Sequence, residues 1–170
     1  AMGGYKLSEI MIPHHELAQN AYPIEVTEVA SVSSVAIAPA GPEPILAMLS
    51  EADIIAGQKI AKKCTACHVF DKGGSNKVGP VLWNVVNAKM GEVDGFAYSA
   101  VLSGFGGAWD YQSLNQFLYK PKAYMKGTKM NFAGLKKPSD RANIIAYLRS
   151  LSDVPADLPT SEQIAAVSGQ

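Results

Sequence analysis

The pentapeptide Cys64-Thr65-Ala66-Cys67-His68 constrains this chain more than any other stretch, because it contains both of the cysteines in the 170 residues. Two cysteines separated by two residues and followed directly by a histidine have the spacing by which proteins attach a c-type haem covalently. On a helical turn the two thiols lie on one face and can reach both vinyl groups of one porphyrin, while the histidine can bind its iron. The motif predicts a covalent haem, and it leaves a zinc site or a redox-active dithiol as alternatives.

The rest of the sequence gives little support to either alternative. A four-ligand zinc site requires a second pair of Cys or His residues, and the other histidines, His14 and His15, lie far away in a polar segment. A redox dithiol usually sits in a βαβ setting, and no such pattern surrounds Cys64. The choice between a covalent haem, a zinc site and a redox-active dithiol depends on the sequence beyond the motif.

The chain has no net charge, but its charges are unevenly distributed. Residues 54–151 hold fourteen basic and five acidic side chains, an excess of nine positive charges, whereas the segments on both sides are acidic. A basic domain of this kind is suited to acidic docking partners, and no nucleic-acid-reading motif accompanies it. No run of about 18 apolar residues is present, and the start lacks the basic and apolar regions of a secretory signal.

These patterns divide the chain into four parts. Residues 1–4 (Ala-Met-Gly-Gly) resemble a cloning scar, in which case the natural N-terminus was removed together with any export signal or anchor. Residues 5–49 are interpreted as a flexible, acidic linker rich in Pro and Ala, because they show no sustained helical or strand period. Residues 50–151 form the predicted globular domain, and 152–170 a polar C-terminal tail in which 161–167 could form a loose helical turn.

The globular part is predicted to be all-α, with three to five short helices joined by long loops. The helices are expected after the capping residues Ser50 and Asp53, near 98–102, after Asp110 as far as 120, and from a cap at Ser139 or Asp140 to about 151. Gly57 would let another helix cross the first one closely. Such a core is thin for about 100 residues, and a buried macrocycle would complete it.

Several further blocks follow the Cys-Cys-His motif in an order that is far more specific than the motif itself. With them, residues 51–151 resemble the class I cytochromes c of the mitochondrial type, and most of all the membrane-anchored cytochromes c (cytochrome c-y type) of alphaproteobacteria. The cytochrome c fold wraps short helices and long loops around a covalently attached haem c. The blocks that carry the resemblance are Val78-Gly79-Pro80, Gly95-Phe96-Ala97-Tyr98, Trp109, Pro121-Lys122-Ala123-Tyr124, Gly127-Thr128-Lys129-Met130 and Ile145-Ala146-Tyr147-Leu148.

The resemblance implies one haem c with two thioether bonds and two axial ligands. Cys64 and Cys67 would form the thioethers. His68 would bind the iron through one ring nitrogen while its other N–H donates to the Pro80 carbonyl, which fixes the orientation of the ring. Met130 would be the sixth ligand, and its thioether sulfur favours Fe(II).

The same resemblance assigns supporting roles around the cofactor. Tyr98 and Trp109 would hydrogen-bond a buried haem propionate, and Thr128 would help to hold the ligand loop in place. Gly57 and Tyr147 would meet where the first and last helices cross.

A haem with both axial positions filled would leave no site for a substrate or O₂, which indicates a one-electron carrier and not an enzyme. The resemblance implies that this carrier serves a respiratory chain. The partners expected from the resemblance are the cytochrome bc1 complex as donor and a haem–copper terminal oxidase as acceptor. The protein would be a periplasmic monomer, tethered to the inner membrane by a segment that precedes the sequence. Transient electrostatic docking is expected through lysines that surround the haem edge in the family, which here are Lys63, Lys122, Lys129, Lys136 and Lys137.

Two rival functions remain open at this stage. An open-iron haem enzyme of the peroxidase type would require that Met130 does not bind the iron. A haem-based sensor would exchange Met130 for another ligand, such as Lys129 or Lys126, near neutral pH.

Overall fold

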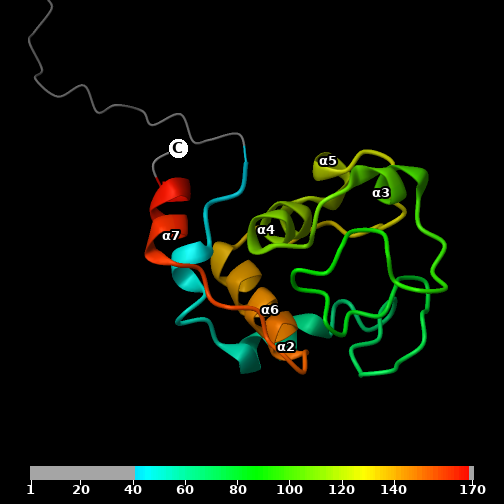
Figure 1. The fold of residues 1–170 in the computed structure, drawn as a ribbon, viewed down its shortest axis with the longest axis horizontal. Coiled ribbons are helices and arrows are strands. Elements are labelled where there is room, and N and C mark those ends of the chain that lie inside the picture. The colour runs from blue at the N-terminus through cyan, green and yellow to red at the C-terminus, as the bar shows by residue number, and fades with distance from the viewer. Residues whose placement is uncertain (1–40, 169–170) are drawn as a thin grey trace, which may run out of the picture. The chain divides into compact units, whose positions relative to one another are not determined.

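A computed structural model describes residues 41–168, which form six α-helices, one 3-10 helix and no strand (Figure 1). The predicted scar at 1–4, most of the predicted linker and the pair His14-His15 lie outside the described residues. The all-α prediction is confirmed, and the predicted globular part, residues 50–151, contains five α-helices, as expected. No helix in this range has the length and apolar character needed to cross a membrane. The elements are η1 (Leu46–Met48), α2 (Ile54–Ala61), α3 (Ala100–Phe105), α4 (Tyr111–Tyr119), α5 (Pro121–Tyr124), α6 (Pro138–Ser150) and α7 (Ser161–Ser168).

Helix α2 leads directly into the cysteine motif. It begins at Asp53, whose carboxylate accepts hydrogen bonds from the backbone N–H groups of Ile55 and Ala56 at 2.8 and 3.0 Å. Asp53 is therefore the cap, and Ser50 lies outside the helix. Beyond the helix, the backbone N–H groups of Cys67 and His68 both donate to the Cys64 carbonyl, so the motif occupies the turns that follow α2.

Helices α2 and α6 cross in contact with each other at Gly57, as the sequence predicts. A Cβ atom placed on Gly57 would lie 2.1 Å from the Asn143 carbonyl oxygen and 2.8 Å from the Cβ of Tyr147. Only glycine permits this approach, because the opposing atoms belong to the backbone of α6. The crossing fixes α2, and with it the start of the cysteine motif, against the longest helix of the described residues.

Two of the predicted helix starts differ in the structure. Helix α3 is capped by the Ser99 side chain and starts two residues later than the expected segment 98–102. Helix α6 begins with Pro138 in its first turn and has no side-chain cap, so the prediction of a cap at Ser139 or Asp140 is wrong. The fixed φ angle of proline suits the first helical position and replaces a cap there. The predicted cap Asp110 is present on α4, where it accepts from the Ser113 N–H at 2.7 Å.

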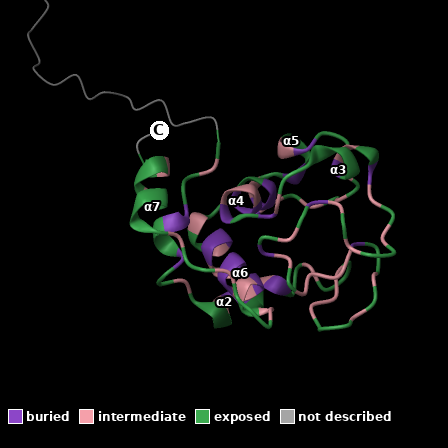
Figure 2. Ribbon diagram, in the orientation of Figure 1, coloured by how far each residue is buried: buried purple, intermediate pink, exposed green. Residues whose placement is uncertain are grey.

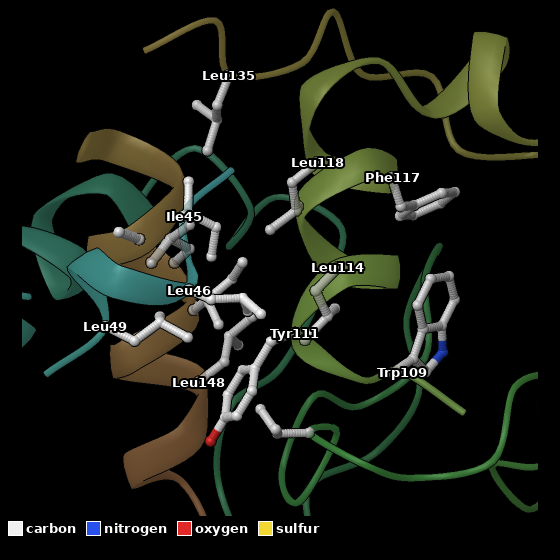
Figure 3. Close-up of a cluster of buried hydrophobic side chains, with 14 of the residues drawn as sticks. Ile45, Leu46, Leu49, Trp109, Tyr111, Leu114, Phe117, Leu118, Leu135 and Leu148 are labelled. Carbon is white, nitrogen blue, oxygen red and sulfur yellow. The ribbon is translucent and has the colours of Figure 1, made fainter. Parts of the chain in front are cut away.

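The core of the domain includes both ends of the described segment, which the sequence assigns to a linker and a tail. Ile45, Leu46 and Leu49 are buried, and Ile164 and Val167 of α7 pack against the same cluster (Figure 2). Helix α7 lies against η1. The structured domain thus begins before residue 50 and continues past 152, because these short apolar groups complete the core beside α4 and α6 (Figure 3).

Candidate cofactor site

One largely apolar cavity collects all of the predicted site residues. It has a volume of about 280 Å³, close to the lower end of the roughly 300–1,000 Å³ range of small-molecule sites. Its walls come from the cysteine motif, the 78–85 segment, the 93–99 segment, α4, the 128–132 loop and the inner face of α6. The predicted residues that line it are Cys64, Cys67, His68, Pro80, Tyr98, Trp109, Thr128 and Met130.

The ring of His68 is held from two sides. Its Nδ1 lies 2.7 Å from the Pro80 carbonyl oxygen, and because a carbonyl only accepts, Nδ1 carries the proton. The ring also packs on Gly79, where an added Cβ would lie 2.4 Å from the imidazole Cε1. Burial lowers the pKa of His68, and the hydrogen bond to Pro80 opposes this effect only in part. The imidazole is therefore neutral, with Nε2 as the nitrogen that can bind a metal.

The two thiols of the motif both lie in the wall of the cavity. Cys64 is half-buried and Cys67 exposed, and both are free, so the pair forms no disulfide. Burial raises the pKa of the Cys64 thiol, and the neighbouring Cys67 adds to this, while Lys63 opposes it. Within residues 41–168 no group of three His, Cys, Asp or Glu residues could hold a metal ion, which argues against a zinc site. The same residues form no βαβ unit, which argues against a redox dithiol.

The loop that carries Met130 is tied down by its two preceding residues. Thr128 Oγ1 accepts a hydrogen bond from the Met130 backbone N–H at 3.3 Å. The ammonium group of Lys129 donates to the carbonyl oxygens of Ala97 and Tyr98, at 2.8 and 3.2 Å. These contacts join the Met130 loop to the segment that supplies Tyr98 to the cavity.

Tyr98 and Trp109 present polar atoms within the otherwise apolar lining. The Tyr98 hydroxyl accepts from the Val93 N–H at 3.3 Å and so keeps its own proton for another acceptor. Burial raises the pKa of Tyr98, which keeps the hydroxyl protonated at neutral pH. Trp109 is buried, with its ring 4.8 Å from the ring of Phe117. Two such donors suit a buried carboxylate such as a haem propionate.

The five lysines predicted to surround the cofactor edge differ in their positions. Lys63 and Lys129 line the cavity, and the other three are not part of its wall. Lys122 donates to the Asn131 side chain at 2.8 Å. Lys136 donates to the Tyr119 carbonyl at 2.8 Å and lies over its ring. The acceptors of Lys122 and Lys136 are uncharged, so neither contact is an ion pair.

Sequence reasoning missed some residues that support the site. Asn76 bridges two loops, since its Nδ2 donates to the Asp94 carbonyl and its Oδ1 accepts from the Val81 N–H. Its place directly after the Gly73-Gly74-Ser75 turn is typical of such a bridge. The support that Lys129 gives the Met130 loop has no local signal, because its acceptors lie about thirty positions earlier in the chain.

The residues present fit a covalently bound haem. One cavity offers two free thiols, one neutral imidazole with an available Nε2, one thioether and an apolar wall. Soft sulfur and imidazole nitrogen are donors that suit iron in a porphyrin. Gly79 leaves the ring of His68 the space that a side chain would fill.

Comparison with known proteins points to the same cofactor. Residues 54–152 match the family described as Cytochrome c. A cytochrome c homolog of Bradyrhizobium diazoefficiens is 49% identical over 127 residues, which is 74% of this chain and 69% of that protein. A cytochrome c homolog of Rickettsia felis is 38% identical over 149 residues, covering 88% of this chain and 85% of that protein. Among solved structures, cytochrome cH from Methylobacterium extorquens superposes with a TM-score of 0.55 at 46% identity, covering 58% of this chain and 99% of that one.

Proposed function

Because this chain belongs to the cytochrome c family, whose members are haem-based electron carriers and not enzymes, we propose that it carries single electrons in a respiratory chain, from a cytochrome bc1 complex to a haem–copper terminal oxidase. The family, the cytochrome c fold and the covalent haem c predicted from the sequence are confirmed. The respiratory partners and the individual ligand assignments are the steps that we add.

The proposed ligand set is supported by the arrangement of the cavity. Cys64 and Cys67 hold the cofactor through thioethers, and His68 and Met130 bind the iron. A haem held in this way supplies a one-electron Fe(III)/Fe(II) couple. The hydrogen bond to Pro80 holds the His68 ring in one orientation, and the contacts of Thr128 and Lys129 restrain the loop of Met130. A restrained ligand set favours electron transfer, because the geometry changes little with the oxidation state.

The observation that carries this proposal is the convergence of all eight predicted site residues on one cavity. The test is a redox titration of the purified holoprotein combined with cyanide binding. We expect one reversible one-electron transition, slow cyanide binding and no peroxidase turnover. Fast and tight cyanide binding at neutral pH would instead support the open-iron enzyme and contradict an electron carrier in which His68 and Met130 would both hold the iron.

Partner docking is proposed to use the lysines near the cofactor. Lys63 lies at the cavity and is exposed, so its charge can meet an acidic surface. The rate of electron transfer to oxidase-containing membranes should fall as ionic strength rises. Lys63→Gln and Lys137→Gln should lower this rate several-fold at low salt, and Lys59→Gln, an exposed lysine of α2 outside the predicted docking set, should leave it unchanged. Equal effects of all three variants would contradict a localised docking face.

We also propose that the protein acts in the periplasm, tethered to the inner membrane by a segment upstream of the described residues. The resemblance to the membrane-anchored cytochromes c supports this. Fractionation of cells that express the complete gene should recover the haem-stained protein in the membrane pellet, facing the periplasm. Recovery in the soluble periplasmic fraction would contradict the anchor, and recovery in the cytoplasm would contradict the location.

A further inference from the structure

Within residues 41–168, Arg141 of α6 is the single charged residue that is buried, and none of its surface is exposed. Each of its nitrogens has an acceptor. Nε donates to Asn115 Oδ1 at 2.7 Å, and Nη1 donates to the carbonyl oxygens of Leu135 and Lys136. Nη2 donates to Glu43, both to its carbonyl oxygen at 3.3 Å and to its carboxylate at 3.0 Å. A guanidinium group removed from water requires such partners, so Arg141 depends on Glu43 from the other end of the chain.

The backbone of Glu43 is held more firmly than its side chain. Its carbonyl oxygen also accepts a hydrogen bond from Asn115 Nδ2 at 3.1 Å, and Asn115 itself is 1% exposed. Two buried side chains, one from α4 and one from α6, thus converge on one carbonyl. The Glu43 carboxylate is 64% exposed, so its ion pair with Arg141 contributes little by itself. Arg141 and Asn115 therefore bind the backbone at position 43 more than the Glu43 side chain.

The residues after Glu43 continue the contact with apolar side chains. We call residues 43–49 the N-terminal arm. Ile45, Leu46 and Leu49 are buried in the core, and Figure 3 shows them beside α6 and facing α4. Helix α7 lies against η1, with Ile164 and Val167 packed on the core cluster. The arm is therefore bound by polar contacts at its start and by apolar contacts along its length.

The N-terminal arm is separate from the cofactor site. The residues that line the cavity run from Lys63 to Leu148 and include none from the arm or from α7. In Figure 3 the arm faces Leu114 and Leu118 of α4, which themselves line the cavity, and Trp109 and Phe117 lie on the other side of that helix. The arm also precedes the segment 54–152 that matches the family. It lies outside the segment that defines the family match.

We propose that Arg141 and Asn115 form a binding seat for the N-terminal arm, which fixes the point where the preceding segment leaves the domain. The preceding segment then ends at residue 42 and not at the start of α2. Compared with a segment that runs to the start of α2, the preceding segment is shorter by about ten residues, or roughly 35 Å of extended chain. The inference goes beyond the proposed function and does not depend on it.

Spin labels on two exposed positions, introduced as Ala47→Cys in η1 and Gln116→Cys in α4, test the seat in the full-length reduced holoprotein. Pulsed electron paramagnetic resonance should give one narrow distance distribution. Asn115→Ala and Arg141→Met should each broaden it, and Glu51→Gln, an exposed acid just after the arm, should not. Hydrogen exchange at the Met48 and Leu49 amides, which donate to carbonyls within the arm, should become at least ten-fold faster in the two seat variants.

Two results would overturn the proposal: a broad distribution in the doubly labelled parent, or a narrow one that persists in both seat variants. If Arg141→Met fails to fold, Asn115→Ala decides the role of the polar seat. Leu46→Ser, which weakens only the apolar contacts, should also broaden the distribution, and its failure to do so would contradict docking of the arm. The near-infrared spectrum of the oxidised form of each variant reports Met130 ligation separately, so a failure of the proposed function would leave the distances unchanged.

Discussion

Gly57→Ala should destabilise the protein even though alanine is the better helix former. The new methyl carbon would lie 2.1 Å from the Asn143 carbonyl oxygen, 2.7 Å from its carbonyl carbon and 2.8 Å from the Cβ of Tyr147. Carbon–oxygen contacts in proteins are about 3.3 Å or longer, so α2 and α6 would have to move apart by more than about 1 Å. Overpacking of this kind costs about 1–3 kcal/mol, against a gain of at most about 1 kcal/mol in helix propensity.

Because the two closest opposing atoms belong to the backbone of α6, the cost falls in the upper part of that range, at about 2–3 kcal/mol. The expected net loss is then about 1–2 kcal/mol, or a melting temperature lower by roughly 4–10 °C for a domain of this size. Chemical and thermal unfolding of the oxidised holoprotein, followed by circular dichroism, would measure it. Gly104→Ala is the matched control, because Gly104 lies in α3 with nothing within 4 Å of its added Cβ. It should stabilise the protein by up to about 1 kcal/mol. If Gly57→Ala is as stable as the parent, the crossing of α2 and α6 is not as close as described.

Three further variants test other contacts. Lys129→Ala removes two charge-assisted hydrogen bonds from the Met130 loop. Discounted for solvent exposure, their loss should weaken the attachment of the loop by about 1 kcal/mol, so imidazole should bind the oxidised protein about five-fold faster. Lys126→Ala should not change that rate. The Tyr111 hydroxyl donates to two carbonyls of the C-terminal tail. Burial, more than any other cause, raises the pKa of Tyr111 above the usual value near 10. The stabilising effect of the neutral hydroxyl is therefore complete below pH of about 10 and is lost as pH rises through the higher pKa of the folded state. Denaturation at a series of pH values should therefore show a steeper alkaline loss in the parent than in Tyr111→Phe, and parallel curves would contradict the assignment. Thr160→Ala removes the N-cap hydrogen bond of α7 and should destabilise this helix by about 1 kcal/mol. Amide hydrogen exchange should become faster in α7 and stay unchanged in α2. If exchange in α7 stays slow, packing alone holds the helix.

The helices with local caps could be predicted from the sequence. Asp110 marks the start of α4, and Asp53 marks α2, because each carboxylate satisfies N–H groups two or three residues away. The close approach at Gly57 was also predicted, since a glycine inside a helix that serves no turn suggests a neighbouring backbone. The grouping of the remaining cavity residues in one site was predicted from the resemblance to a family and not from their spacing alone.

Contacts between distant parts of the chain could not be predicted. The partners Arg141 and Glu43 are 98 positions apart, and an arginine on a helix normally predicts an exposed side chain. The apolar residues of the N-terminal arm follow Pro42 and Pro44, which suggested a linker, and only the tertiary packing shows their burial. Helix α7 did have a local signal, since Thr160 and Gln163 form a reciprocal capping box that the interpretation as a polar tail overlooked.

The most direct test of the central claim is a near-infrared absorption spectrum of the oxidised holoprotein at neutral pH. If Met130 and His68 bind the iron of one covalent haem, the spectrum contains a sulfur-to-iron charge-transfer band. The band should disappear in Met130→Ala and persist in Met125→Leu, which replaces a buried core methionine by a residue of similar volume. Absence of the band from the parent, or its persistence in Met130→Ala, would contradict the ligand set on which the proposed electron carrier rests.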